Sequence, residues 1–286
     1  MLTLLFDGIA YGMLLFVLAV GLAVTLGLMN FINLAHGAFA MAGGYAAVLL
    51  MQRAGLPFLA TLPLAFLLTA ALGALAERTL YRPMYAKPHL DQVLFSIGLV
   101  FMAVAAVDFL LGSQQQFVQL PAALRGRFEL EWIGIGRYRL FIVVLCALLA
   151  LALQWVLART RFGSRLRAAV DDARVAAGLG IDVNRVFLLT FAVGSGLAGL
   201  GGALGTEVLG LDPSFPLKFM VYFLIVVAVG GTSTITGPLA AALLLGIADV
   251  FGKYYAPRLG GFIVYTLMIV ILLARPQGLF ARQGAR

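Results

Sequence analysis

Three polar side chains interrupt an apolar stretch near the start of the chain. Asn30, Asn33 and His36 lie within residues 8–52, which are 45 residues without a charged side chain, and Gly37 follows them. In lipid an amide or imidazole without a partner is costly, so these groups should face a bundle interior or a wet pathway. They either form a network that holds a helix break together or contact a passing solute. Because no cluster of His, Cys or carboxylates accompanies His36, a metal site is not expected.

A second polar interruption lies in the later half of the chain. Residues 219–248 are 30 residues without a charge, and residues 230–238 in their middle read Gly-Gly-Thr-Ser-Thr-Ile-Thr-Gly-Pro. One helix of that length would measure about 45 Å, which is too long for one crossing and short for two. Since glycine and proline weaken helices, we expect a break here. The hydroxyls of Thr232 and Ser233 either face a solute or cap a half-helix.

The two expected breaks, at residues 29–37 and 230–238, lie one in each half of the chain. Paired interruptions of this kind in a membrane protein indicate a translocation site, built from short helices, tight hairpins or re-entrant segments. A pair of ordinary interhelical turns is the alternative.

The longest polar insertion, residues 159–185, is rich in arginine. Small and apolar residues recur within it at three- and four-residue steps, which predicts one amphipathic helix over residues 164–181 that Gly178 and Gly180 terminate. Such a helix suits docking into a groove on a partner, and lying in the anionic headgroup layer is the alternative. The arginines are Arg159, Arg161, Arg165, Arg167, Arg174 and Arg185.

The elements that position these groups are expected to cross a membrane. Of the 286 residues, 63% are hydrophobic and only 11% are charged, and the mean hydropathy is +1.04. Soluble domains carry roughly 45–50% apolar and about 25% charged residues, so a soluble enzyme is a poor interpretation. A lone cysteine, Cys146, excludes an internal disulfide. Because the apolar runs are continuous rather than alternating, they indicate helices and not a barrel.

We therefore predict an all-α integral membrane protein. It is a single transmembrane domain over residues 1–286, a polytopic bundle of eight or nine crossings with two broken or re-entrant segments. The first residues lack a basic region and a small-residue cleavage site, so they are interpreted as the first retained span.

Basic residues predict the orientation of this bundle. Placing residues 159–185, residues 77–91 and the C-terminal tail in the cytoplasm gives twelve basic residues inside and eight outside, as the positive-inside tendency prefers. Residues 112–138 then form an external loop, the amino end is external and the carboxyl end is cytoplasmic. The net charge of +8 does not indicate nucleic acid, because the basic residues lie between the apolar runs.

Three acidic residues near span ends and a set of small residues need no functional interpretation. Asp108, Glu207 and Asp249 fall close to the ends of apolar runs, and we expect them at the membrane interface. Gly194 and Gly202, with Ala198 between them, have the small-residue spacing that permits close helix contact.

Four stretches of the chain, taken in order, are informative as a set. They are Asn-Phe-Ile-Asn-Leu-Ala-His-Gly at 30–37, Ala-Ala-Gly-Leu-Gly-Ile at 176–181, Val-Gly-Gly-Thr-Ser-Thr-Ile-Thr-Gly-Pro at 229–238, and Arg-Pro-Gln-Gly-Leu-Phe at 275–280. Together they span almost the whole chain, and they resemble the branched-chain amino acid (Liv-type) family of bacterial ABC importer permeases. The second resembles the cytoplasmic coupling loop of such permeases, although Val175 stands where the general importer pattern has an acidic residue.

The resemblance implies a multi-pass subunit of a bacterial inner membrane and a set of partners. These are a second homologous permease, as a heterodimer rather than a homodimer, two cytoplasmic ABC ATPases and a periplasmic solute-binding protein. The chain has no GxxxxGK[ST] loop, so we expect no enzyme and no cofactor of its own, with ATP and Mg²⁺ on the ATPases.

Two residue sets carry these expectations. The translocation pathway would involve Asn30, Asn33, His36, Gly37, Thr232 and Ser233. Coupling to the ATPases would involve Arg165, Arg167, Asp171, Ala176, Ala177, Gly178, Gly180 and Ile181.

The expected function is import of branched-chain or other neutral amino acids, or of a small amide such as urea. Few fixed charges lie in the apolar runs, as a pathway for a zwitterion requires. A passive channel for small neutral solutes is one alternative, but it would not need the amphipathic insertion. An ion-coupled secondary transporter is the other, and it would need mid-membrane carboxylates, for which only Asp108 is a candidate.

Overall fold

The computed structural model describes every residue except 30, 131–132, 232–234, 276–277 and 280–286. The helices before the first strand are α1 (Leu2–Met29), α2 (His36–Ala54), α3 (Phe58–Ala76) and α4 (His89–Leu111). Those after the hairpin are α5 (Arg137–Arg159), α6 (Arg161–Asp171), α7 (Ala173–Gly178), α8 (Val183–Leu209), α9 (Phe215–Gly230), α10 (Thr236–Tyr255) and α11 (Gly260–Ala274). Short turns are η1 (Glu77–Tyr81), η2 (Arg82–Met84), η3 (Ala122–Leu124) and η4 (Pro257–Leu259).

The predicted all-α polytopic membrane bundle is confirmed. Seven described segments are long and apolar enough to cross a membrane, namely α1, α3 with η1 and η2, α4, α5, α8, α10, and η4 with the 15-residue α11. Helix α9 is apolar but has only 16 residues. A count of eight crossings therefore needs either α9 or the 19-residue α2 as well, and a count of nine needs both.

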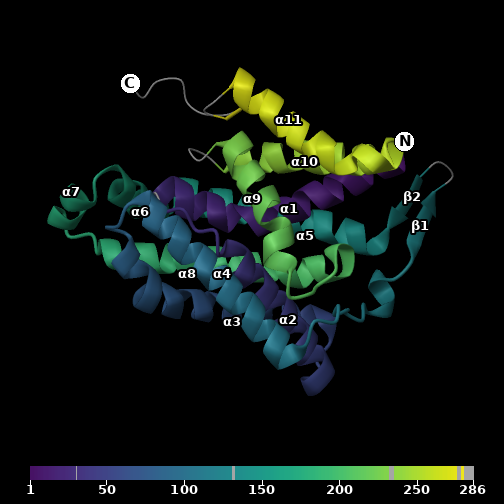
Figure 1. The fold of residues 1–286 in the computed structure, drawn as a ribbon, viewed down its shortest axis with the longest axis horizontal. Coiled ribbons are helices and arrows are strands. Elements are labelled where there is room, and N and C mark those ends of the chain that lie inside the picture. The colour runs from purple at the N-terminus through teal and green to yellow at the C-terminus, as the bar shows by residue number, and fades with distance from the viewer. Residues whose placement is uncertain (30, 131–132, 232–234, 276–277, 280–286) are drawn as a thin grey trace.

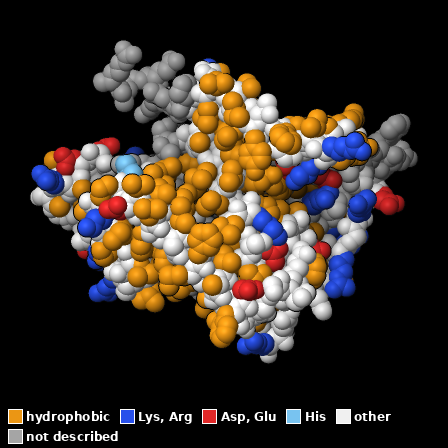
Figure 2. Space-filling view, in the orientation of Figure 1, with side chains coloured by type: hydrophobic (Ala, Val, Ile, Leu, Met, Phe, Trp, Pro, Cys, Tyr) orange, Lys and Arg blue, Asp and Glu red, His pale blue; other side chains and the backbone are white. Residues whose placement is uncertain are grey.

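Helices α1 and α8 form the centre of the bundle, and α4, α5 and α11 lie at its periphery (Figure 1). In the most apolar 18-residue stretch of each span, 78% of α1 and 72% of α8 is buried within the protein, whereas only 11% is buried in the spans of α4 and of α11. Figure 2 shows hydrophobic side chains over much of one face, with basic side chains at both ends. Such a surface fits lipid as its solvent.

Glycines let the central helices approach closely. A Cβ built on Gly202 of α8 would lie 1.8 Å from the carbonyl oxygen of Ala40 in α2. One built on Gly21 of α1 would lie 2.4 Å from the carbonyl oxygen of Gly194. Neither position has room for a side chain, which confirms the close helix contact predicted from the small residues of α8.

The chain places two polar structures at opposite ends of the bundle. Helices α6 and α7 lie at one end, and a hairpin of β1 (Arg127–Leu130) and β2 (Ile133–Gly136) lies at the other, beside the start of α1 (Figure 1). The hairpin is antiparallel and lies within the predicted external loop, residues 112–138. Tyr85, which follows η2, packs edge-on against Phe187 near the start of α8, 6.1 Å between ring centres, and so belongs to the α6–α7 end. Which end faces the cytoplasm stays a prediction.

Candidate functional site

The first predicted helix break is present between α1 and α2. Asn33 and His36 are 1% and 2% exposed. The Oδ1 of Asn33 accepts a hydrogen bond of 3.1 Å from the Tyr81 hydroxyl, and the His36 Nε2 donates one of 2.8 Å to the Leu18 carbonyl oxygen. Both groups thus take part in bonds that hold the break, while their contact with a solute stays a prediction. Asn30 lies outside the described residues.

Side chains from distant elements fix the same break. Phe31 packs edge-on against Tyr81 and Tyr85, with ring centres 5.4 and 5.6 Å apart. The backbone N–H of Ile32 donates to Oε1 of Gln92 in α4 at 3.3 Å. Sequence reasoning missed these partners, because they lie some 50 to 60 positions further along the chain.

The first break also packs against α9, the helix that leads to the second break. A Cβ on Gly37 would lie 3.0 Å from the Cα of Pro216. The His36 ring meets Phe223 edge-on at 6.3 Å between ring centres. The fold therefore brings the predicted pathway residues His36 and Gly37 against α9.

The second predicted break is present between Gly230, which ends α9, and Thr236, which begins α10. Gly231 adopts a φ of +78°, which favours glycine. A Cβ on Gly230 would lie 2.5 Å from the backbone nitrogen of Pro238, so the two helix ends touch through backbone. The predicted pathway residues Thr232 and Ser233 lie outside the described residues.

The C-terminal motif packs onto this second break. The backbone N–H of Leu279 donates to the Val229 carbonyl oxygen at 2.7 Å. Gly278, with a φ of +88°, would carry a Cβ 2.9 Å from the backbone nitrogen of Gly231. The described parts of two motifs that the resemblance singled out, residues 229–238 and 275–280, are thus neighbours in the fold.

The insertion of residues 159–185 folds as two helices, so the prediction of one helix over residues 164–181 is wrong. Asp172 causes the interruption, with an extended backbone at φ −153°. Its Oδ1 accepts hydrogen bonds from the backbone N–H groups of Arg174 and Val175, at 2.8 and 3.0 Å. The side chain thereby caps a new helix, α7, in place of continuing α6. Gly180, with a φ of +81°, follows the end of α7 as predicted.

Helices α6 and α7 share a small core with α8. Leu166, Ala169, Ala176 and Val186 are all buried in it, and the half-buried Ile181 packs against them. The predicted coupling residue Ala176 therefore faces inward. A Cβ on Gly163 would lie 2.1 Å from the Leu157 carbonyl oxygen, so α6 lies tightly against the end of α5.

The outward side of α7 is apolar and uncovered. Ala177 and Gly178 are exposed, and the side chains of Val175 and Leu179 are 59% and 76% exposed. We call these four residues the α7 face. A Cβ on Gly178 would meet nothing within 4 Å, so this glycine leaves the face open. An exposed apolar patch rimmed by polar residues is a candidate interaction surface.

The insertion that carries the α7 face is rich in arginine. Within residues 159–185, six arginines against Asp171, Asp172 and Asp182 leave a net charge of 6 − 3 = +3. The predicted coupling residues Arg165 and Asp171 are exposed, as is Arg167, which donates to the Leu157 carbonyl oxygen. No salt bridge joins any of these arginines to an acid in the part of the chain that the structure describes.

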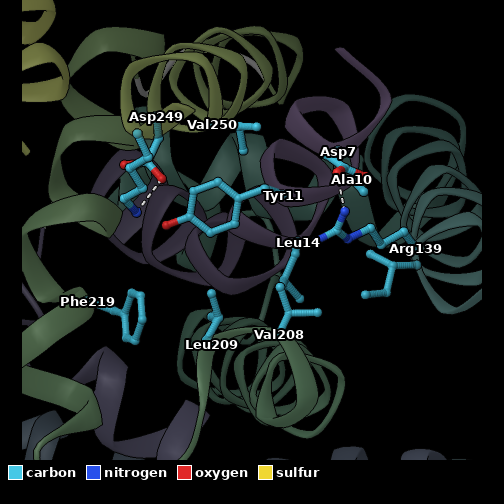
Figure 3. Close-up of a pocket in the computed structure, with 12 residues that line it drawn as sticks. Asp7, Ala10, Tyr11, Leu14, Arg139, Val208, Leu209, Phe219, Asp249 and Val250 are labelled. Carbon is cyan, nitrogen blue, oxygen red and sulfur yellow. Dashed lines mark hydrogen bonds and ion pairs between the residues drawn. The ribbon is translucent and has the colours of Figure 1, made fainter. Parts of the chain in front are cut away.

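A cavity of about 300 Å³ lies toward the hairpin end, between α1, α5, α8, α9 and α10 (Figure 3). Asp7 of α1 forms an ion pair with Arg139 of α5. Asp249 of α10 pairs with Lys253 at 2.6 Å and accepts a hydrogen bond of 3.4 Å from the Tyr222 hydroxyl.

The burial of Asp249 corrects a prediction. Its side chain is only 2% exposed, whereas Asp108 and Glu207, also expected at the membrane interface, are exposed. The sequence held one signal, because Lys253 follows at four residues, a spacing that puts both side chains on one helix face.

A further ion pair lies outside the cavity, in the loop before α9. Asp212 accepts hydrogen bonds from the Lys218 ammonium and from the backbone N–H and hydroxyl of Ser214. Partial burial acts to raise the pKa of the Asp212 carboxyl, but these donors outweigh it and hold the pKa below its ordinary value.

Comparison with known proteins matches residues 4–272 to the family described as the permease component of branched-chain amino acid transport systems. The high-affinity branched-chain amino acid transport system permease protein BraD of Pseudomonas aeruginosa is 27% identical, over 97% of this chain and 95% of its own length. LivH of Escherichia coli K12 is 27% identical over 97% of this chain and 94% of its own length. LivM of Salmonella typhimurium is 27% identical over 93% of this chain and 68% of its own. No solved structure matches.

Proposed function

Since this chain belongs to the family of permease components of branched-chain amino acid transport systems, we propose that it is the permease subunit of an ATP-driven importer for branched-chain or other neutral amino acids. The match covers nearly the whole bundle, and its relatives are transport permeases. The chain's role is to form a pathway, with discrimination resting largely on an external binding protein.

A second, homologous permease completes the pathway in this proposal. Both LivH and LivM, which are differently named permease proteins of high-affinity branched-chain amino acid transport systems, are similar to this chain. This likeness to two kinds of permease supports a heterodimer over a homodimer. A periplasmic binding protein delivers the solute to the hairpin end, which we place outside.

The α6–α7 end is then cytoplasmic and receives two ABC ATPases, which hold the ATP and Mg²⁺. The observation that carries this assignment is the α7 face, an uncovered apolar surface within a basic rim that stands on its own small core. A groove in an ATPase subunit can hold such a face by burying Val175 and Leu179. The arginines at the rim would guide the encounter with an acidic surface.

The same packing supplies a route for mechanical coupling. ATPase closure would displace α6 and α7 together, because Leu166, Ala169 and Ala176 share one core with Val186 of α8. Helix α8 in turn lies in backbone-close contact with α1 and α2. Movement of α8 would therefore shift the elements on both sides of the first break, and α9 against it.

Uptake by a purified assembly tests the proposed function. The chain is co-expressed with its permease and ATPase candidates, purified by a tag on this chain and reconstituted with the binding protein. We expect the ATPases to co-purify and labelled leucine to enter the vesicles only with ATP. Uptake of urea and not of any neutral amino acid would show that the proposed substrate is wrong. Flux that does not depend on ATP would favour a passive channel.

A further inference from the structure

The charged groups that line the cavity come in balanced pairs. Two carboxylates, Asp7 and Asp249, face two cations, Arg139 and Lys253, which gives a net charge of −2 + 2 = 0. A lining with both signs and no net charge matches a solute that carries both signs itself. It disfavours an anion or a cation, because either would bring a net charge that the lining does not compensate.

These groups retain capacity to bond a ligand. In the described part of the chain, the buried Oδ1 of Asp7 has no hydrogen-bond partner. The Lys253 ammonium has three donors, of which one goes to Asp249, and it lies 5.7 Å from the centre of the Tyr11 ring. Figure 3 shows Tyr11 between the two ion pairs.

The rest of the lining is apolar. Leu14 and Ile142 are buried beneath the cavity, and Leu209, Phe219 and Val250 contribute half-buried side chains. This wall suits an aliphatic side chain, whereas urea would leave it unused. At about 300 Å³ the cavity stands at the lower end of the range for small-molecule sites, which fits a solute of amino-acid size.

We propose that this cavity binds a neutral α-amino acid with an aliphatic side chain, as a station on the permeation pathway at the hairpin end. The ammonium group binds the carboxylate of Asp249, the carboxylate binds Lys253, and the side chain lies against Phe219 and Val250. Asp7 and Arg139 balance the opposite side. This inference rests on the proposed function, for which it specifies the substrate class and a site.

Equilibrium binding to the full chain in lipid nanodiscs tests the site. The probe is tritiated leucine, with 4-methylpentanoate, which lacks the amine, and isopentylamine, which lacks the carboxylate, as competitors. We expect saturable leucine binding, with each analogue weaker by roughly tenfold or more, because each loses a charge-assisted bond. Absence of saturable leucine binding overturns the site.

Two variants test which residue binds the ammonium group of the solute and which binds its carboxylate. Asp249→Asn should weaken leucine and isopentylamine roughly tenfold and leave 4-methylpentanoate unchanged, and Lys253→Gln should show the reverse preference between the analogues. Lys253 has a side chain that is 57% exposed, so its variant keeps the test valid even if Asp249→Asn fails to fold. Equal weakening of all three ligands, or no change in Lys253→Gln, contradicts the assignment.

The loop pair supplies a matched control. Asp212 and Lys218 form an ion pair outside the cavity, so Lys218→Gln should leave the binding of all three ligands unchanged. Leucine uptake by the assembled importer separates the two proposals. If the Asp249→Asn variant takes up leucine at the wild-type rate, the proposed binding site is wrong but the proposed function stands. If the wild-type assembly imports no neutral amino acid, the proposed function is wrong.

Discussion

The insertion at the α6–α7 end and the cavity at the hairpin end differ in how their charged side chains are paired. At the α6–α7 end, residues 159–185 carry a net positive charge, and their arginines stand on the surface without a salt bridge among the described residues. At the hairpin end, Asp7 with Arg139 and Asp249 with Lys253 balance each other around a cavity. Unpaired charge beside an apolar face suits a large partner, and paired charge around a hollow suits a small dipolar solute.

Burial separates the two ends in the same sense. Leu179 is 76% exposed, while Asp249 is 2% exposed. The exposed Leu179 is open to a partner surface, and the buried carboxylate of Asp249 is tolerated because its lysine and tyrosine partners accompany it. In our proposals, function at one end depends on a docked protein and at the other on a bound solute.

The largest effect is expected from Gly178→Arg at the α7 face. The side chain has room, since nothing lies within 4 Å of the Cβ position, so the bundle should keep its unfolding temperature. A charged side chain in the proposed docking groove should lower ATP-driven uptake by tenfold or more, because an unpaired charge buried in an interface costs several kcal/mol. The measurement is uptake and ATPase activity of reconstituted assemblies, with Gly178→Ala as the control that should retain both. Full uptake by the arginine variant would show that this face is not the coupling surface.

A smaller effect of the same kind is expected from reversing charge at the rim. The double variant Arg165→Glu with Arg167→Glu should slow assembly with the ATPases and lower coupled uptake several-fold, mainly at low salt, because rim charges act through a screened field. Arg159→Glu with Arg161→Glu, which reverses the same charge in the same insertion, tests whether the effect belongs to the neighbourhood of the α7 face. Coupling that is insensitive to both pairs at low salt would contradict the electrostatic part of the comparison.

Removing an arginine should cost more stability at the hairpin end than at the α6–α7 end. Arg139→Gln leaves the carboxylate of Asp7, whose side chain is only 18% exposed, without its cation, and should destabilise the isolated chain by about 1 kcal/mol or more. Arg165→Gln, at an exposed position, should stay within about 0.5 kcal/mol of the wild type. Thermal unfolding in one detergent compares them. Equal losses would show that the ends do not differ in how their arginines are held.

The sequence predicts much of this fold, because apolar run length and helix-breaking residues are local signals. Both breaks follow from polar, glycine and proline residues inside apolar runs, and the tight packing of α8 follows from its small residues. The division of the insertion at Asp172 was missed, since the cap that starts α7 competes with an equally good helical periodicity.

The cavity could not be predicted in the same way. Its Asp7–Arg139 ion pair joins α1 to α5 across the bundle, and the Asn33–Tyr81 bond at the first break spans 48 positions, so neither leaves a spacing pattern. Asp249 with Lys253 is the exception, because both lie on one helix. Coupling and pathway residues were predicted as sets, but their orientation was not, as the inward-facing Ala176 shows.

The smallest effect concerns the Asp212–Lys218 ion pair, which lies outside the cavity. The lowered pKa of Asp212 means that its charged form stabilises the fold at pH above its unfolded value of about 3.9, and that this contribution is lost as pH falls through the lower folded value. Asp212→Asn should therefore cost about 0.2–1 kcal/mol at pH 7. The difference from the wild type should shrink as pH falls below about 3.9 and through the lower folded pKa, as unfolding measured across pH will show. A difference that persists in acid would assign the effect to the cap at Ser214 and not to charge.

Site-directed cross-linking tests the central claim, that the α7 face holds the ATPase, most directly. The chain has one cysteine, the buried Cys146, so a Cys146→Ser background permits single cysteines at Leu179 and at Phe128 of the hairpin, both exposed positions. With a photoactivatable maleimide on each, the account predicts a covalent product with the ATPase subunit from Leu179→Cys and none from Phe128→Cys. An intact assembly in which Leu179→Cys yields no such product, or in which Phe128→Cys yields it, would contradict the account.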